Sequence, residues 1–280
     1  MEYGLSFQRP ESLDIALEAL KEPGIKIIAG GTDVFPAMQQ GQTPTAFLDV
    51  TRVDGMSRIS HSDGMTRIGA AITWTEIVNA DLPPAFDSLK QAAREVGSLQ
   101  IQNTGTVAGN ICNASPAADG VPPLLTLNAQ VEVASAERGA RVFDLADFIQ
   151  GVRQTALADD ELVTAILIPD QPSGARSAFE KLGSRRYLVI SICMASANIL
   201  LNEDGLISLA RVAVGSCSAV AQRLPALERD LIGTRPGDVK VHEAHLSPLA
   251  PIDDVRGSGA YRLDVVKEQC RRAVLKAGEQ

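Results

Sequence analysis

The sequence predicts an α+β protein with a larger N-terminal module and a smaller C-terminal one. Several segments carry apolar residues at helical spacing, and short apolar runs between turn residues are typical of buried strands. The run Pro169-Asp170-Gln171-Pro172-Ser173-Gly174 is the strongest boundary signal in the 280-residue chain. We therefore expect one module over residues 1–172 and a second over residues 173–280.

The first fifty residues predict one helix and two strands. Ser12 is a suitable N-cap, and Glu22-Pro23-Gly24 is a stop signal after the helix. The apolar run from Ile25 to Ala29 predicts a short buried strand that ends at Gly30-Gly31, and the run from Ala46 to Val50 predicts a second strand. Between the cap and the stop, four apolar residues share one helix face: Leu13, Ala16, Leu17 and Leu20.

The middle of the chain alternates helix and strand signals around one long segment without a clear period. Thr73 and Glu76 have capping-box spacing for a helix. The segment from Gln102 to Pro123 is rich in small residues, and we expect an ordered loop there, because long loops in compact modules are usually functional. Further strands are predicted at Thr66–Ala71, Leu127–Ala134 and Leu162–Ile168, and a further helix face at Leu89, Ala92, Ala93 and Val96.

The C-terminal module is predicted to combine a sheet with two helices. Apolar runs favour strands at Ala178–Lys181, Ile190–Leu201 and Leu209–Gly215. The last helix is expected from about Tyr261 to Lys276, where apolar residues recur at helical spacing.

Composition excludes several classes of function. The formal net charge of −8 argues against a nucleic-acid partner, which would need a basic face. The longest apolar region, Tyr187 to Leu201, is too short and too polar for a membrane span of about 20 residues. Met1 to Leu5 show no start of a secretory signal, so we expect a cytoplasmic protein. We predict no metal site, because the four cysteines are scattered without a C-x-x-C pair: Cys112, Cys193, Cys217 and Cys270.

Two segments have the composition of ligand-binding turns. In the first, a strand runs into Gly30-Gly31, whose bare backbone N–H groups suit an anion, although a tight turn that needs positive φ is an alternative explanation. No G-x-G-x-x-G or P-loop pattern is present. In the second, polar side chains recur among small residues from Asn103 to Asp119, which favours close approach to a large flat ligand. Asp119 either caps the next helix or accepts bonds from ligand hydroxyl groups.

Together these segments resemble the FAD-binding signatures of the flavin subunits of the xanthine dehydrogenase and carbon monoxide dehydrogenase family. Ala29 to Val34 resembles that family's A-G-G-T-D-L turn, and Thr106 to Asp119 is similar to its T-I-G-G-N-I-x-x-A-S-P-x-x-D segment. Phe179 to Arg186 looks like its F-x-K-x-G-x-R-R segment, and Tyr261-Arg262 begins a similar Y-R…R helix, so the resemblance spans essentially the whole chain. Ala108 departs from the pattern, because the family usually has a glycine there.

The resemblance implies a two-part FAD-binding domain of the vanillyl-alcohol-oxidase (PCMH) type, with subdomains at about 1–55 and 56–172, followed by a small α+β C-terminal domain. It implies that one set of residues holds the FAD pyrophosphate through its backbone: Ala29, Gly30, Gly31, Thr32, Asp33 and Val34. It further implies that a second set lines the flavin and its ribityl–phosphate arm, with Lys181 as a flavin neighbour: Thr106, Gly109, Asn110, Asn113 and Asp119.

The resemblance also implies an electron-transfer subunit of a molybdenum hydroxylase, built as a dimer of heterotrimers. A large subunit with the molybdenum cofactor would oxidise the substrate, and a small subunit with two-iron–two-sulfur clusters would relay electrons. FAD on this chain would pass them to an external acceptor such as NAD⁺, oxygen or a quinone. We predict no catalytic side chain here, because no nucleophile–base set is present and the histidines are scattered. A self-sufficient flavin oxidase or reductase and a non-catalytic assembly subunit are the alternatives.

Overall fold

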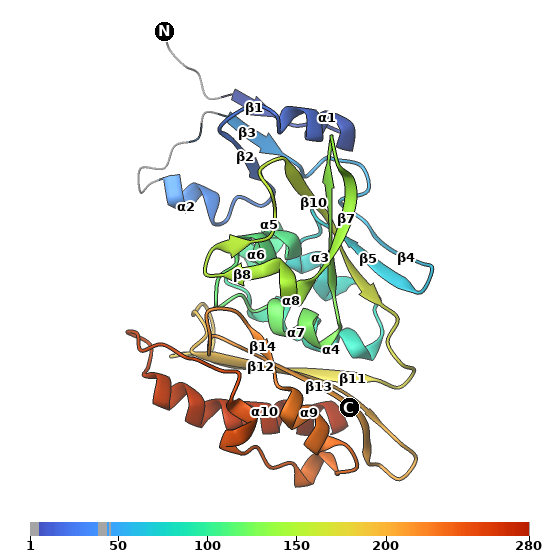
Figure 1. Cartoon of the computed structure of the whole chain (residues 1–280), viewed down its shortest axis with the longest axis vertical. Helices are drawn as coiled ribbons and strands as arrows, with labels where there is room; N and C mark the ends of the chain where they lie inside the picture. The colour runs from blue at the N-terminus through green and yellow to red at the C-terminus, as the bar shows by residue number, and fades with distance from the viewer. Residues whose placement is uncertain (1–5, 39–43, 45, 280) are drawn as a thin grey trace.

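The computed structural model describes residues 6–38, 44 and 46–279, so Met1 to Leu5 lie outside the described residues. The chain begins with a parallel three-stranded sheet in the order β1–β3–β2, drawn in blue in Figure 1. The Ser12 side chain accepts a hydrogen bond from the Ile15 N–H at 3.3 Å, which confirms the predicted N-cap. The elements of this first part are β1 (Ser6–Gln8), α1 (Leu13–Ala19), β2 (Ile25–Ile28), α2 (Val34–Met38) and β3 (Ala46–Asp49).

An antiparallel sheet follows, in the order β4–β5–β10–β6–β7, with the nine-residue β10 at its centre. The predicted capping box is confirmed, because Thr73 and Glu76 exchange side-chain and backbone hydrogen bonds at the start of α3. The strands and their hairpin are β4 (Ile59–Ser62), β5 (Met65–Gly69), β6 (Gln130–Ser135), β7 (Gly139–Asp144), β8 (Ile149–Gly151), β9 (Gln154–Thr155) and β10 (Glu161–Pro169). The helices outside the 99–126 region are α3 (Trp74–Asn79), a 3₁₀ turn (Pro84–Phe86), α4 (Asp87–Glu95) and α8 (Leu145–Phe148).

The prediction of a loop from Gln102 to Pro123 is wrong, because this region is mostly helical. It contains α5 (Leu99–Thr104), α6 (Val107–Asn113) and α7 (Val121–Thr126). Each helix has only six or seven residues, too few to show a clear apolar period. Isolated helices of this length are marginal, so burial against the rest of the protein stabilises them.

The C-terminal part contains a four-stranded antiparallel sheet in the order β11–β12–β13–β14. Figure 1 shows this sheet as a layer between the red helix α10 and the green helices α4 and α7. The predicted strands are present, although β12 begins at Cys193 rather than at Ile190. The elements are β11 (Arg176–Leu182), β12 (Cys193–Leu201), β13 (Ile207–Gly215), β14 (Gln222–Arg223), α9 (Pro225–Leu231), two 3₁₀ turns (Pro236–Asp238 and Glu243–Leu246) and α10 (Gly259–Glu279).

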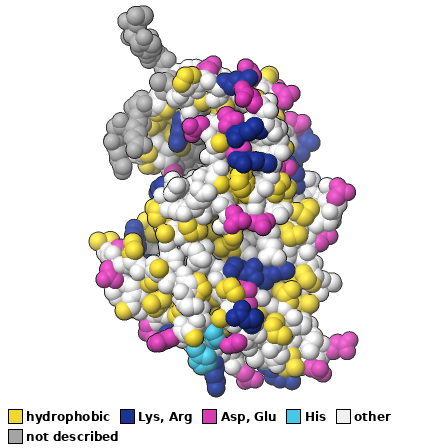
Figure 2. Space-filling model, viewed as in Figure 1, with side chains coloured by type: hydrophobic (Ala, Val, Ile, Leu, Met, Phe, Trp, Pro, Cys, Tyr) yellow, Lys and Arg dark blue, Asp and Glu magenta, His cyan; other side chains and the backbone are white. Residues whose placement is uncertain are grey.

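Opposite charges lie close together on the surface. Figure 2 shows Lys and Arg side chains among Asp and Glu side chains on the face that it presents. In the five-stranded sheet, Arg67 contacts Glu132 at 2.8 Å and Arg141 contacts Glu161 at 2.6 Å, so each pair links two strands that flank a third. Within the part of the chain that is described, no helix is long and apolar enough to cross a membrane.

Candidate functional site

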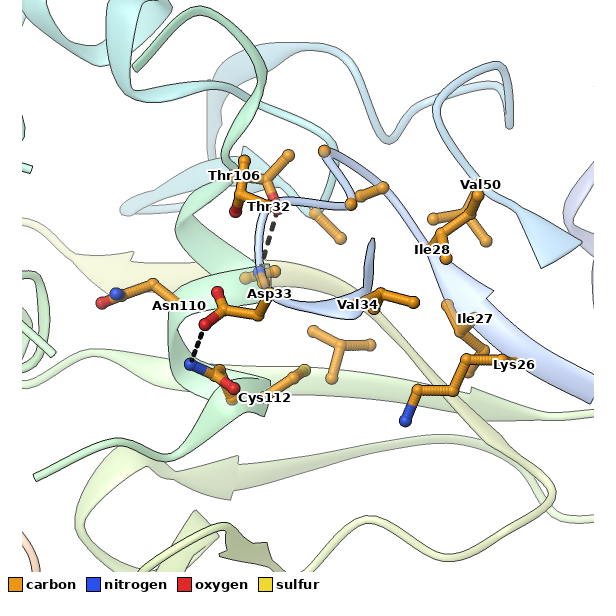
Figure 3. Close-up of a pocket in the computed structure, with 18 of the residues that line it drawn as sticks. Lys26, Ile27, Ile28, Thr32, Asp33, Val34, Val50, Thr106, Asn110 and Cys112 are labelled. Carbon is orange, nitrogen blue, oxygen red and sulfur yellow. Dashed lines mark hydrogen bonds between the residues drawn. The ribbon is translucent and has the colours of Figure 1, made fainter. Parts of the chain in front are cut away.

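A cavity of about 1060 Å³ lies where the two predicted ligand-binding segments meet. Figure 3 shows side chains from β2 and its following turn gathered with side chains of α6 around this space. A third segment, residues 153–163, completes the wall. Ten of the twelve predicted cofactor-binding residues lie on the wall: Ala29, Gly30, Gly31, Thr32, Asp33, Val34, Thr106, Gly109, Asn110 and Asn113. The structure therefore brings together residues that are about eighty positions apart in the chain.

The paired glycines after β2 are required by the packing of the turn itself. A Cβ on Gly30 would lie 2.0 Å from the Thr104 carbonyl oxygen at the end of α5. Gly31 has a φ of +67°, which side chains rarely adopt, and a Cβ there would lie 2.3 Å from the Phe35 ring. The alternative explanation, a turn that needs positive φ, is thus correct for Gly31. Gly30 thus allows the turn to close against the end of α5, Gly31 leaves room for the Phe35 ring, and the turn forms one wall of the cavity.

A neighbouring part of the wall is the first turn of α6, which its own cap holds in place. The Thr106 hydroxyl accepts a hydrogen bond from the Gly109 N–H at 2.9 Å. The Val107 N–H donates to the Ile72 carbonyl at 3.1 Å and so connects the start of α6 to the segment just before α3. A Cβ on Gly109 would meet only the Thr106 hydroxyl within 4 Å, so the surface of the helix at this glycine is otherwise open.

One residue of the cavity wall carries a buried polar atom that lacks a partner. The Asn110 Oδ1 atom is buried and has no hydrogen-bond partner among the described residues. Because buried polar atoms are nearly always paired, this oxygen is suited to accept from a ligand N–H or O–H group. FAD offers such donors on its ribityl chain and its flavin ring. The residues present therefore fit the cofactor that the sequence predicts.

The wall segment after β9 is anchored by a buried carboxylate. The Glu161 side chain, 1% exposed, accepts hydrogen bonds from Arg141 Nε at 2.6 Å and from the Ala158 N–H at 2.9 Å. Burial acts to raise the pKa of Glu161, but the bonds from Arg141 and Ala158 outweigh it, so the pKa lies below its usual value. Glu161 is thus an ionised anchor of the wall and not an acid–base group.

Sequence reasoning missed several wall residues that carry polar or titratable groups, among them Lys26, Cys112 and Arg153. Lys26 stands on β2, and a charged residue within an otherwise apolar strand is a signal that could have revealed it. Cys112 lies on α6 and is an exposed free cysteine.

Asp119 and Lys181 lie outside this wall and contact each other. Lys181 Nζ is 2.7 Å from Asp119 Oδ2, and the Ser191 hydroxyl donates to Asp119 Oδ1 at 2.6 Å. Asp119 does not cap α7, which begins after Gly120 without a side-chain cap. Burial raises the pKa of Asp119 above its usual 3.8, although Lys181 and Ser191 act to lower it. The pair joins the segment after α6 to β11.

Two histidines, His61 and His245, contact aspartates away from this cavity. His61 contacts Asp170 at 2.7 Å, and the buried His245 contacts Asp230 at 2.9 Å. Among the described residues, no group of three or more His, Cys, Asp or Glu side chains is arranged to hold a metal ion.

Comparison with known proteins identifies the family. Residues 2–171 match the family model of the FAD binding domain in molybdopterin dehydrogenase, and residues 177–277 match the carbon monoxide dehydrogenase flavoprotein C-terminal domain. The chain belongs to the FAD-binding medium subunits of molybdenum hydroxylases. It is thus an oxidoreductase subunit, and FAD is its cofactor.

Individual relatives of this medium subunit match along nearly the whole chain. It is 31% identical to the nicotine 6-hydroxylase medium subunit of Paenarthrobacter nicotinovorans, over 98% of this chain and 97% of that one. It is 28% identical to the carbon monoxide dehydrogenase medium chain of Afipia carboxidovorans, over 97% and 96%. The structure superposes on a chain of reconstituted carbon monoxide dehydrogenase from Oligotropha carboxidovorans with a TM-score of 0.89, 26% identity and coverage of 99% and 98%. In complexes of this type, the molybdenum cofactor and the iron–sulfur clusters belong to partner subunits.

Ala108→Gly is expected to weaken the fold without improving cofactor binding. The Ala108 side chain is 4% exposed and packs in the core, so its methyl group stabilises α6 more than it obstructs the cavity. We expect a loss of about 0.5–1 kcal/mol in the free energy of unfolding, the usual cost of glycine in a helix. The FAD dissociation constant of the medium subunit should change by less than about twofold, which corresponds to under half a kcal/mol. A several-fold gain in affinity would instead favour the assembly-subunit alternative.

Proposed function

We propose that FAD lies in the cavity, with its pyrophosphate against the turn from Ala29 to Val34 and its ribityl chain along α6. The unpartnered amide oxygen of Asn110 is the observation that carries this proposal, because a ribityl hydroxyl or the flavin N3–H would satisfy it. Backbone N–H groups of the turn suit the phosphates, since oriented amides bind anions without a lysine-rich pocket. FAD supplies the redox chemistry, and the chain orients it and limits its exposure.

Asp119 and Lys181 are proposed to border the flavin end of the site. Asp119 follows α6 in the chain, and Lys181 lies on β11. Their buried ion pair offers a carboxylate oxygen and an ammonium group close to the α6 segment that forms part of the wall. In this arrangement the FAD-binding module spans residues 1–172, with parts at about 1–55 and 56–172, and the C-terminal module spans residues 173–280.

We further propose that the medium subunit receives electrons from an iron–sulfur partner and delivers them to an external acceptor. The acceptor is NAD⁺, oxygen or a quinone, and the assembly is a dimer of heterotrimers that works in the cytoplasm. The four cysteines are free thiols, which supports a reducing compartment. The organic substrate binds to the large subunit in this proposal, and this chain therefore needs no acid–base residues of its own.

Removing the Asn110 amide tests the placement of FAD. The complex carrying Asn110→Ala is expected to bind FAD about five- to tenfold more weakly, the effect of one lost hydrogen bond. Asn79→Ala, at an exposed position at the end of α3, is the matched control and should bind FAD as the wild type does. Unchanged affinity in Asn110→Ala would contradict the placement.

Anaerobic reduction of the complex, followed by mixing with each acceptor class, identifies the acceptor from the rate of flavin reoxidation.

A further inference from the structure

Arg153 makes contacts that link the β8–β9 hairpin to α6. It stands at the tip of the hairpin with a φ of +59°, a backbone region that non-glycine residues keep only when surrounding contacts hold them there. Its N–H donates to the Ala114 carbonyl at 2.9 Å. Its Nη1 group donates to the Asn113 carbonyl at 3.2 Å and also to the Asn113 side-chain oxygen. The hairpin tip is therefore fixed to the C-terminal end of α6.

Asn113 extends this connection to the turn after β2. Its Nδ2 atom donates to Asp33 Oδ1 at 3.0 Å, while its Oδ1 atom accepts from Arg153. An amide has one accepting and one donating end, so the guanidinium and the carboxylate together select a single orientation of the side chain. Without the Arg153 cation, only the Asp33 carboxylate favours the orientation in which the Asn113 nitrogen faces Asp33.

We propose that Arg153 is a positioning residue for the cofactor, which acts through Asn113 to hold the Asp33 carboxylate and the phosphate-binding turn against α6. This inference rests on the placement of FAD in the cavity. Asp33 directly follows Gly30, Gly31 and Thr32, so a bond to its side chain restrains the turn whose N–H groups face the pyrophosphate. The same bond holds the Asp33 carboxylate on the Asn113 amide. The nearby Arg153 cation offsets the repulsion between the Asp33 carboxylate and the phosphates of FAD. Asp33 and Asn113 thus serve the site by fixing each other in addition to lining it.

The test is a double-mutant cycle on the release of FAD from the assembled complex. Arg153→Met and Asn113→Ala should each speed FAD dissociation about fivefold, the effect of about one hydrogen bond. Because both changes break the same connection, the double variant should release FAD within about twofold of either single variant. Arg153→Lys keeps a cation at the hairpin tip and should restore most of the wild-type rate. Arg176→Met, which removes an exposed arginine on β11, should release FAD at the wild-type rate.

Two results would overturn the inference. If the effects of Arg153→Met and Asn113→Ala multiply to about 25-fold, Arg153 contacts FAD directly and does not act through Asn113. If FAD release is unchanged and only the unfolding midpoint of the FAD-free complex falls, the contact is structural. Both results differ from the result expected if FAD does not lie in this cavity. In that case Asn110→Ala has no effect on FAD affinity, while the wild-type complex still contains FAD.

Discussion

Lys181→Met is expected to lower the free energy of unfolding of the medium subunit by about 3–5 kcal/mol, because it leaves a buried carboxylate without its cation. The Lys181 and Asp119 side chains are 7% and 9% exposed, and their charged atoms are 2.7 Å apart. After the substitution, only the Ser191 hydroxyl and the buried surroundings remain around Asp119. Urea unfolding of the chain in its complex, monitored by fluorescence and circular dichroism, measures this loss of unfolding free energy.

The surface pair Lys21–Glu18 provides the control, because its side chains are 46% and 69% exposed. Lys21→Met should cost less than about 1 kcal/mol. In the double variant Asp119→Asn/Lys181→Met no unpaired charge is buried, so its loss should be smaller than the sum of the two single losses. The buried-pair explanation is wrong if Lys181→Met is as mild as Lys21→Met, or if the two losses simply add.

The effect of Lys181→Met should also depend on pH. Burial already raises the pKa of Asp119 above 3.8, and removal of the cation raises this pKa further. Below the unfolded pKa, near pH 4, the carboxyl group is protonated in both states, and little is lost. Between the folded pKa of the wild type and the higher folded pKa of the variant, Asp119 of the variant ionises only in the unfolded chain, so the stability deficit of Lys181→Met grows with pH and then levels off. The deficit should therefore be smaller at pH 5 than at pH 8.

The elements that the sequence predicts well carry their information locally. The helix α1 has a capping residue and a complete apolar face, and β10 is a buried run of nine residues, seven of them fully buried or nearly so. The strand β7 could not be predicted in this way, because five of its six residues are exposed and none of them shows a buried face. The helices α5 to α7 were missed for the complementary reason, since each is shorter than two full turns.

The residues of the site were likewise predicted where the information is local in the sequence. Ten wall residues could be predicted because they occupy two continuous motifs, each of which is readable without knowledge of the fold. Arg153 belongs to no motif, and its role depends on a hairpin tip that meets α6 about forty residues away. Asp119 and Lys181 illustrate the limit of a motif, because the sequence placed each of them against the cofactor but did not predict that they contact each other.

Gly30→Ala is expected to abolish stoichiometric FAD binding and to lower the free energy of unfolding by about 3 kcal/mol or more. The new Cβ would lie 2.0 Å from the Thr104 carbonyl oxygen and 2.8 Å from the Gly105 nitrogen. Both are backbone atoms, so no side-chain rotation relieves the contact, and the cost exceeds the about 1–3 kcal/mol usual for overpacking a core. Relief requires the turn after β2 to move away from α5, which opens the wall of the cavity where the FAD phosphates are proposed to bind.

Gly237→Ala is the matched control for this prediction, because a Cβ on Gly237 would meet nothing within 4 Å and its φ is not positive. Its free energy of unfolding should stay within about 0.5 kcal/mol of the wild type. Flavin absorbance per chain and the urea midpoint distinguish the two variants. If Gly30→Ala retained full FAD content with a wild-type midpoint, the close approach of the turn to α5 would not be what forms the site. The cofactor would then depend on α6 and its unpaired Asn110 oxygen alone, and Asn110→Ala would become the more damaging change.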